Sequence, residues 1–160
     1  MKKETINKII SILFVLYIVV LVYILFLYGG RKGNLFEVEL FSKEHFAMVN
    51  YVPFSTIISF IERAIEGSIN MDIVVKNLAS NLLMFIPMGM ALPVLFEKRF
   101  NKLWKLVVLM FVLVATIEVV QFISFYGSAD IDDLIFNVVS AVIGYGIVRL
   151  SFVRRMLKLS

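Results

Sequence analysis

Carboxylate and carboxamide side chains interrupt the apolar second half of this chain at helical spacing. Glu118 and Gln121 are three residues apart inside one apolar run, and Asp133 and Asn137 are four apart at the start of the next. Residues at these spacings lie on one face of a helix. In an apolar medium such groups are costly unless they find partners, line a polar cavity or transfer protons. The spacing therefore indicates candidate sites for binding or for acid–base chemistry.

A third apolar run carries the same kind of side chain, because Asn77 and Asn81 are also four residues apart. The candidate ligand-binding residues are Asn77, Asn81, Glu118, Gln121, Asp130, Asp133 and Asn137. The candidate catalytic residues are Glu118, as general acid or base, and Asp133, as its orienting partner or a cation ligand. A divalent ion held by Glu118, Asp130 and Asp133 with the amide oxygens stays an alternative, but their spacing matches no known motif. No metal site and no cofactor are predicted.

The composition indicates a membrane protein. Of the 160 residues, 61% are hydrophobic, whereas about half is usual in soluble domains. The net charge of +4 does not indicate nucleic-acid binding, because Lys and Arg occur in short clusters beside apolar runs and no glycine-rich phosphate loop is present. The chain has no cysteine, which excludes disulfides and thiolate metal sites. We expect membrane lipids as partners, with a lipoglycopeptide or a cell-wall precursor as further candidates, and no nucleic acid.

Four apolar runs are long enough to cross a bilayer as helices, which takes about 20 residues. They cover about 6–28, 73–96, 103–125 and 131–150. The first run is too long for the apolar region of a signal peptide, and no cleavage site follows it, so we expect it to be retained. The predicted fold is all-α: one polytopic membrane domain over residues 1–160, built as a bundle of four transmembrane helices.

Basic residues predict the orientation of this bundle. Three Lys near the N-terminus, four Lys or Arg in the loop after the second run and four near the C-terminus account for eleven of the sixteen in the chain. By the positive-inside rule, both termini are expected to be cytoplasmic. Residues 29–72 and the turn 126–130 are then external.

The external segment is predicted to contain an amphipathic helix. From 54 to 66, isoleucine and phenylalanine recur at helical spacing with polar residues opposite, as in a helix that lies in the headgroup region or caps the bundle. A short strand is predicted at 35–41 from its partial alternation. His45 is the only histidine and stands alone in this segment, which makes a metal site there improbable.

The predicted orientation places the polar residues of three helices in one layer. At 1.5 Å per residue they lie about 3–14 Å below the outer surface. Buried ionisable residues normally face the bundle interior or a wet cavity. We therefore expect one polar pocket that opens outward among the second, third and fourth spans. Ser140 and Gly144 continue the stripe of Asp133 and Asn137, and their small size predicts a close helix contact.

Four sequence blocks in order resemble the VanZ-like membrane proteins. The blocks are Asn50-Tyr-Val-Pro-Phe54, Asn81-Leu-Leu-Met-Phe-Ile-Pro-Met-Gly89, Glu118-x-x-Gln121 and Asp130-Ile-Asp-Asp133-x-x-x-Asn137. The resemblance covers about 50–146 and implies a small multi-span protein of the bacterial cell membrane. The member that gives the family its name is associated with resistance to teicoplanin, a glycopeptide that bears a lipid tail.

Two departures from the family pattern bear on the site. Family members often carry an arginine shortly before the acidic cluster, where this chain has Gly127, Ser128 and Ala129. That removes a cation that could pair with the aspartates or bind an anion. Ser140 stands where a glycine is commonly found.

Three functions remain open from the sequence. The first is a binding protein whose outward pocket holds a lipid headgroup or cell-wall precursor and lowers susceptibility to lipoglycopeptides such as teicoplanin. The second is a membrane-embedded enzyme that modifies a lipid or lipid-linked substrate, with Glu118 as acid or base. The third is a scaffold within the cell envelope. We rank them in that order, because no nucleophile–base pair is recognisable for catalysis.

Overall fold

The computed structural model describes residues 3–28, 42–47, 49–124 and 127–157. Within these ranges the chain is helical and contains no strand, so the predicted all-α fold is confirmed. The strand predicted at 35–41 lies outside the described residues.

Within the described residues, four helical stretches are long and apolar enough to cross a membrane. They are α1 (Lys3–Tyr23) with a π-helical extension (Ile24–Tyr28), α4 (Met71–Met84) followed by α5 (Ile86–Leu95), α6 (Leu103–Ile123), and α7 (Ile131–Arg149). All four agree with the predicted spans to within a few residues at each boundary. The second span differs in kind, because it is two helices rather than one.

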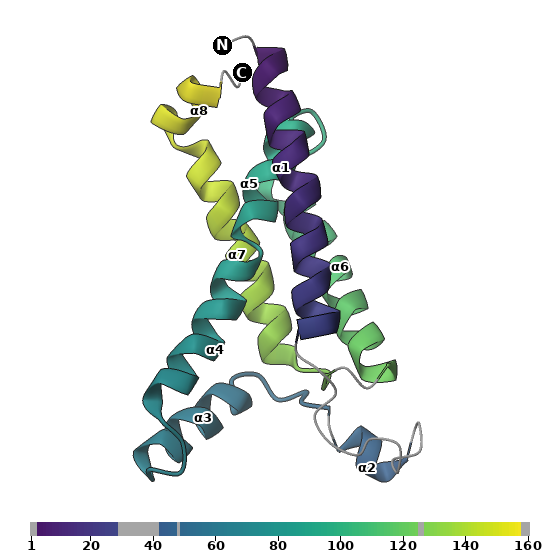
Figure 1. Cartoon of the computed structure of the whole chain (residues 1–160), viewed down its shortest axis with the longest axis vertical. Coiled ribbons are helices and arrows are strands. Elements are labelled where there is room, and N and C mark those ends of the chain that lie inside the picture. The colour runs from purple at the N-terminus through teal and green to yellow at the C-terminus, as the bar shows by residue number, and fades with distance from the viewer. Residues whose placement is uncertain (1–2, 29–41, 48, 125–126, 158–160) are drawn as a thin grey trace.

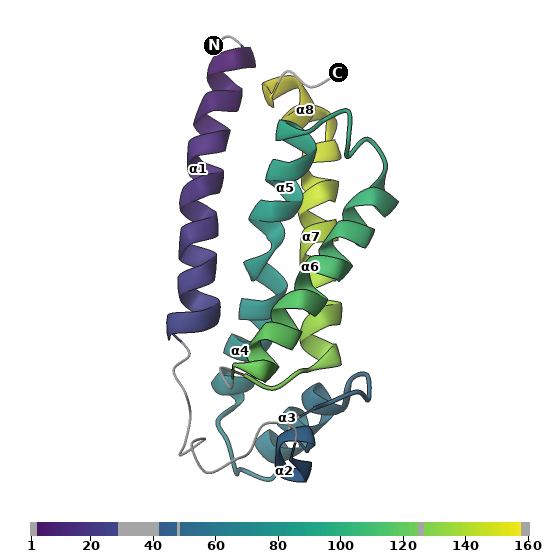
Figure 2. The ribbon, with the colours of Figure 1, turned by 90° about the vertical axis from the view of Figure 1, so that its right-hand side faces the viewer.

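Three further helices lie outside these spans. They are α2 (Lys43–Phe46), α3 (Ser55–Ile65) and α8 (Ser151–Leu157). The start of α1 and helix α8 lie at one end of the bundle, and α2 and α3 lie at the other (Figures 1 and 2). We call these the terminal end and the loop end. Helix α3 corresponds to the amphipathic helix predicted at 54–66.

Helix α7 is the centre of the bundle and packs against α4, α5 and α6, while α1 packs against α5. The crossing of α5 and α7 depends on two glycines. A Cβ atom on Gly89 would lie 2.0 Å from the Ala141 carbonyl oxygen, and one on Gly144 would lie 2.2 Å from the Ile86 carbonyl oxygen. Small residues are what allow helix backbones to approach closely in membranes. The close contact predicted at Gly144 is thus found.

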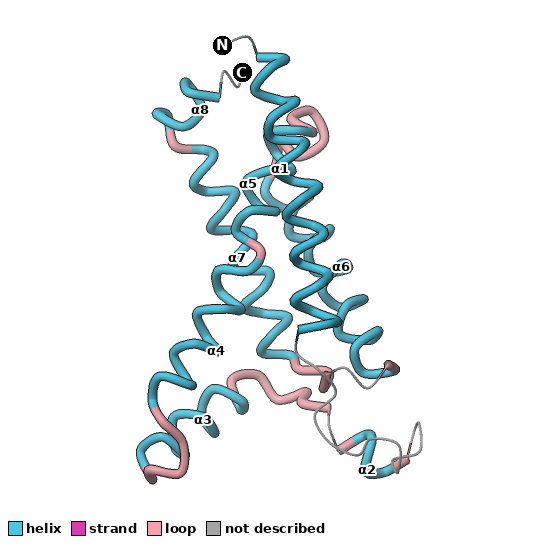
Figure 3. The backbone as a smooth tube through the Cα atoms, viewed as in Figure 1, coloured by secondary structure: helices cyan, strands magenta, loops and turns pink. Residues whose placement is uncertain are grey.

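The second span breaks at Phe85, between α4 and α5 (Figure 3). Pro87 follows in the first turn of α5, and its ring disrupts the hydrogen-bond ladder of the preceding turn. Two side chains satisfy the backbone groups that the break exposes. The Phe85 N–H donates to Ser140 Oγ at 3.0 Å, and the Tyr17 hydroxyl donates to the Met84 carbonyl at 2.9 Å. Backbone groups within a membrane need such partners, because lipid offers none.

The apolar core runs along the facing sides of these helices, with Phe85, Leu106, Met110 and Val114 fully buried. Many large apolar side chains instead remain exposed, above all on α1 and α6. A surface of this kind is unfavourable in water and suited to lipid. The protein is therefore a membrane protein, as its composition predicted.

Candidate functional site

Asp130 begins α7 and joins it to the segment before α3. It is the N-cap of α7, where its side chain accepts a 2.8 Å hydrogen bond from the Asp132 N–H. Caps of this kind satisfy donors that a helix N-terminus leaves open. The same carboxylate also accepts from Asn50 Nδ2 at 2.9 Å and from the Thr56 hydroxyl at 2.6 Å. Asp130 is thus held by three donors and is only 9% exposed.

Asp132 caps a helix other than its own. Its carboxylate accepts from the N–H of Phe54 and, at 3.0 Å, from the N–H of Thr56, both at the start of α3. Phe54 adopts a left-handed conformation with φ 67°, which is uncommon for a residue with a side chain. The buried carboxylate provides the contact that holds this turn. Asp132 therefore fixes the direction in which α3 leaves the bundle.

Asn50 completes the connection through its backbone and its side chain. Its N–H donates to the Ala129 carbonyl at 2.8 Å, and its own carbonyl accepts from the Ile131 N–H at 3.0 Å. Its side-chain oxygen accepts from the Ser55 hydroxyl at 2.7 Å and from the Val52 N–H at 3.1 Å. Two of the sequence blocks, at 50–54 and at 130–133, thus form one unit at the loop end.

Glu118, on α6, contacts this unit from the side of the membrane spans. Its Oε2 accepts from the Asp130 N–H at 3.2 Å, and the side chain is buried in α6. Gln121, one turn further on, donates from Nε2 to the Leu25 carbonyl at 2.9 Å. This carbonyl lies in the last turn of the first span, where backbone acceptors lack partners within the helix. Glu118 therefore holds the turn before α7, whereas Gln121 connects α6 to the π-helical extension of the first span.

The remaining predicted residues divide between α4 and α7. Asn81 Nδ2 donates to Asp133 Oδ1 and joins the two helices. Asn137 lies one turn below Asp133, is 5% exposed, and its Oδ1 has no hydrogen-bond partner among the described residues. Asn77 is different, because its side chain is exposed on α4. The structure thus brings Glu118 and Asp130 together and pairs Asn81 with Asp133, but it gives Asn77 and Gln121 separate surroundings.

His45, which the sequence left isolated, is fully buried at the loop end. Its Nε2 lies 3.0 Å from the Phe122 carbonyl, to which it donates, because a carbonyl oxygen only accepts. The imidazole stacks on the Phe122 ring, with 3.9 Å between centroids and an interplanar angle of 9°. His45 therefore fastens α2 to the end of α6. No signal in the sequence indicated this partner, since the two residues are 77 positions apart.

Two residues of the unit around Asp130, Asn50 and Thr56, were not predicted from the sequence as site residues. Asn50 was interpreted only as part of a turn, and Thr56 as part of the amphipathic helix. Their place in a block that resembles a family was the available signal. No group of three His, Asp or Glu side chains suited to a metal ion occurs in the described part of the chain.

An open cavity of about 520 Å³ lies beside this unit, between α3 and the segment that follows α2. Asn50 and Thr56 separate it from Asp130, with which both are hydrogen-bonded. Ser55, Ser59 and Arg63 contribute further polar side chains to its wall. The cavity thus combines an amide, three hydroxyls and one cation.

The comparison with protein families agrees with the blocks that form this unit. The family model described as VanZ/LLP1 matches residues 14–153. The chain belongs to the VanZ/LLP1 family. Membership links it, at the level of the family, to glycopeptide resistance. No curated protein and no solved structure was found to match it.

The VanZ/LLP1 match includes all four blocks and the C-terminal part of α1 from residue 14. Three of the blocks meet in the structure through Asn50, Glu118 and Asp130. The fourth contributes Asn81, which joins α4 to the acidic cluster of α7, and Gly89, which permits the crossing of α5 and α7. In this VanZ/LLP1 protein, three of the four blocks therefore contribute contacts to the loop end.

Proposed function

We propose that this protein binds a lipid headgroup or a lipid-linked cell-wall precursor at the loop end of the bundle, and thereby lowers susceptibility to lipoglycopeptides such as teicoplanin. The observation that carries the proposal is the polar cavity beside α3, which the Asn50–Asp130 unit holds in shape. The pocket expected among the second, third and fourth spans stays a prediction, and the proposal rests on this cavity instead. Among the polar residues of the spans, Glu118 contacts the unit that borders the cavity through its hydrogen bond with Asp130.

The orientation is part of this proposal. The start of α1, the segment between α5 and α6, and α8 all lie at the terminal end, so the described members of the three basic clusters gather there. Under the positive-inside rule the terminal end faces the cytoplasm. The loop end then faces outward in the bacterial cell membrane, at the surface where lipoglycopeptides meet their targets.

The chemistry of the cavity suits a phosphorylated headgroup. Arg63 is exposed and makes no ion pair with a described residue, so its guanidinium can donate to phosphate oxygens. Ser55, Ser59 and Thr56 provide hydroxyls, which both donate and accept hydrogen bonds. The aromatic ring of Phe60 adds an apolar wall. These are complementary to a headgroup that carries phosphate and hydroxyl or amide groups.

The position of α3 places the cavity at the level of the lipid headgroups. The helix is amphipathic and none of its residues is fully buried, as expected of a helix at the level of the headgroups. Because Asp132 and Asp130 fix its first turn, the cavity is formed before a ligand arrives. Preorganisation of this kind lowers the entropic cost of binding.

Teicoplanin susceptibility tests the proposal. We expect Arg63→Gln, at equal expression, to lose most of the protection that the wild-type protein gives, because the cation of the cavity is removed. Lys76→Gln is the matched control, since Lys76 is exposed near the same end and pairs only with Asp72 among the described residues. Equal protection by both variants would contradict a role for the cavity.

Catalysis by Glu118 is the alternative from the sequence, and the Glu118→Gln variant separates it from binding. In the structure, Glu118 Oε2 accepts the Asp130 N–H, and a glutamine keeps an oxygen that can accept it. A positioning role therefore predicts that Glu118→Gln retains the phenotype and that Glu118→Leu weakens it. An acid–base role predicts that both variants are inactive.

A further inference from the structure

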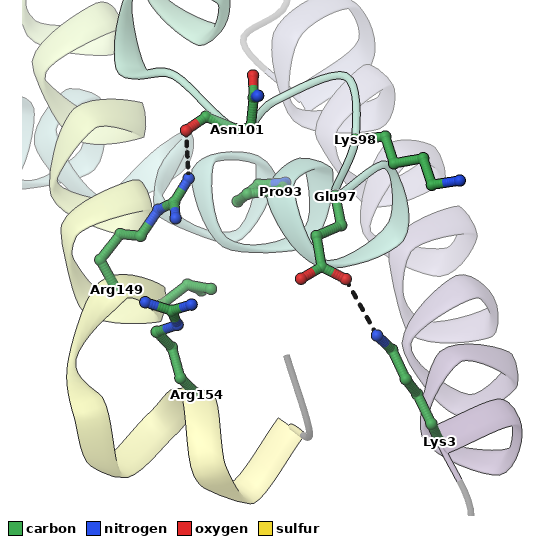
Figure 4. A pocket seen from close by; sticks show the side chains of 8 residues that line it. Lys3, Pro93, Glu97, Lys98, Asn101, Arg149 and Arg154 are labelled. Carbon is green, nitrogen blue, oxygen red and sulfur yellow. Dashed lines mark hydrogen bonds and ion pairs between the residues drawn. The ribbon is translucent and has the colours of Figure 1, made fainter. Parts of the chain in front are cut away.

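A second cavity, of about 390 Å³, lies at the terminal end among α1, α5, α7 and α8. It is lined by four cations, Lys3, Lys98, Arg149 and Arg154, and by one carboxylate, Glu97, which gives the lining a net charge of +3. Arg149 and Arg154 reach it from one side and Lys3 from the other (Figure 4). Glu97 pairs with Lys3 at 3.0 Å. The cavity is therefore suited to an anion.

Arg149 is held in a fixed position in this cavity. Its Nη2 donates to the Asn101 carbonyl at 2.7 Å and to the Tyr145 hydroxyl at 2.6 Å. The guanidinium also lies over the Tyr145 ring, 4.8 Å from its centroid. These partners are uncharged, and the hydrogen bonds to described residues all use Nη2. Arg149 thus retains Nε and Nη1 as donors for an anionic ligand.

An apolar groove of about 280 Å³ adjoins the basic cavity, and Val148 lines both. The groove lies between α1 and α5. It runs from Ile10 and Val94 to Tyr17 and Pro87, a length of about 10 Å at 1.5 Å per residue. Its polar end is the basic cavity, and its other end lies near the middle of the spans. A charged cavity at a membrane surface that continues into an apolar groove matches the shape of a phospholipid.

Basic residues at this end also serve the orientation of the chain, but that role does not require them to converge. The positive-inside rule depends on the number of Lys and Arg near the ends of the spans. Arg155, next to Arg154, meets this requirement as well, yet it is exposed and lies outside the lining of the cavity. The convergence of Lys3, Arg149 and Arg154 from three different helices therefore points to a ligand.

We propose that the basic cavity and the groove together bind one anionic phospholipid from the leaflet at the terminal end. Its phosphate contacts Arg149 and Arg154, and one acyl chain lies in the groove between α1 and α5. Basic sites between transmembrane helices are suited to anionic headgroups of the cytoplasmic leaflet. This site is separate from the loop-end cavity and does not depend on the function proposed for it.

Native mass spectrometry of the purified protein in detergent tests this site. Phosphatidylglycerol is titrated against phosphatidylcholine with the same acyl chains, using the wild-type protein, Arg154→Gln and the matched control Arg155→Gln. We expect phosphatidylglycerol to bind more tightly than phosphatidylcholine. We expect Arg154→Gln to weaken its binding about tenfold, the effect of losing one charged hydrogen bond. Arg155→Gln should bind as the wild type does.

Two further measurements separate a loss of binding from a loss of folding and test the contribution of the acyl chain. Arg154→Lys retains the charge, so it should still prefer phosphatidylglycerol even if Arg154→Gln lowers the melting temperature. Soluble glycerol phosphate lacks the acyl chain and should bind far more weakly than the lipid. The proposal is overturned if the two lipids bind equally, or if Arg154→Gln and Arg155→Gln weaken binding equally. It is also overturned if Arg154→Lys loses the preference, or if glycerol phosphate binds as tightly as the lipid.

Discussion

Asn50 and Asp130 are joined through both their backbones and their side chains, although 80 residues separate them. Their backbones pair as a short parallel bridge, and Asn50 Nδ2 donates to Asp130 Oδ1 at 2.9 Å. The contact joins the segment before α3 to Asp130, the N-cap residue of α7. A carboxylate at the edge of a membrane-spanning helix thus organises the loop that lies outside it. The stability and the shape of the loop end should depend on this pair.

The first prediction concerns the carboxylate of Asp130. Asp130→Asn replaces one acceptor oxygen by an amide, so one of the donors at Asn50, Thr56 and Asp132 loses its partner. Leaving a buried donor unsatisfied costs about 1–3 kcal/mol. Thermal unfolding in detergent should show a clear fall in the melting temperature.

Asp72→Asn is the control for this experiment. Asp72 is exposed and forms only a surface pair with Lys76, and such pairs contribute about 0–1 kcal/mol. Its melting temperature should stay close to that of the wild type. If the two variants melt alike, the Asn50–Asp130 contact does not stabilise the loop end.

The second prediction concerns the crossing of α5 and α7. Gly89→Ala and Gly144→Ala each place a methyl group against a backbone carbonyl, at 2.0 Å and 2.2 Å. The helices must then move apart, at a cost of about 1–3 kcal/mol or more. Gly146→Ala is the matched control, because a Cβ there meets nothing within 4 Å. Destabilisation by Gly146→Ala equal to that of the other two would show that the close approach is not the cause.

The third prediction concerns the break at Phe85. Ser140→Ala removes the acceptor of the Phe85 N–H, which is buried between α5 and α7. We expect a loss of about 1–3 kcal/mol in the free energy of unfolding. Ser80→Ala serves as the control, because Ser80 is exposed and donates only to a carbonyl of its own helix. A Ser140→Ala variant as stable as the control would mean that the break needs no side-chain partner.

The spans could be predicted from the sequence because hydrophobic length is a local property. The break in the second span was not predicted, since it depends on Pro87 together with partners from two other helices, Tyr17 and Ser140. Helix α8 was also missed. It follows α7 after a single residue, Leu150. The residues at this end were interpreted only as a cluster of basic side chains.

The polar residues of the spans were proposed as one set from their spacing, and spacing alone could not predict their contacts. Helical spacing places Asp133 and Asn137 on one face, and it says nothing of which helix they meet. Asn77 illustrates the limit, because it shares the spacing of Asn81 yet remains exposed. The contacts between the segment 50–56 and the start of α7 come from pairs 74–80 positions apart, such as Thr56 and Asp130. Pairing at that range depends on the fold as a whole.

The fourth prediction concerns orientation. Because the chain has no cysteine, single cysteines at Ser68 and at Lys98 report on opposite ends of the bundle. An impermeant thiol reagent applied to intact cells should label position 68 and leave position 98 unlabelled until the cells are opened. Labelling of position 98 in intact cells would reverse the assignment of the loop end to the outside.

The most direct test of the proposed binding is to identify the lipids that stay with the protein when it is extracted in mild detergent from the bacteria that express it. Native mass spectrometry of the wild type should show a bound lipid with a phosphorylated headgroup that Arg63→Gln loses. Lys76→Gln and Arg154→Gln should keep this lipid, because neither residue lines the loop-end cavity. If Arg63→Gln retains the same lipids as the wild type, the loop-end cavity is not the binding site.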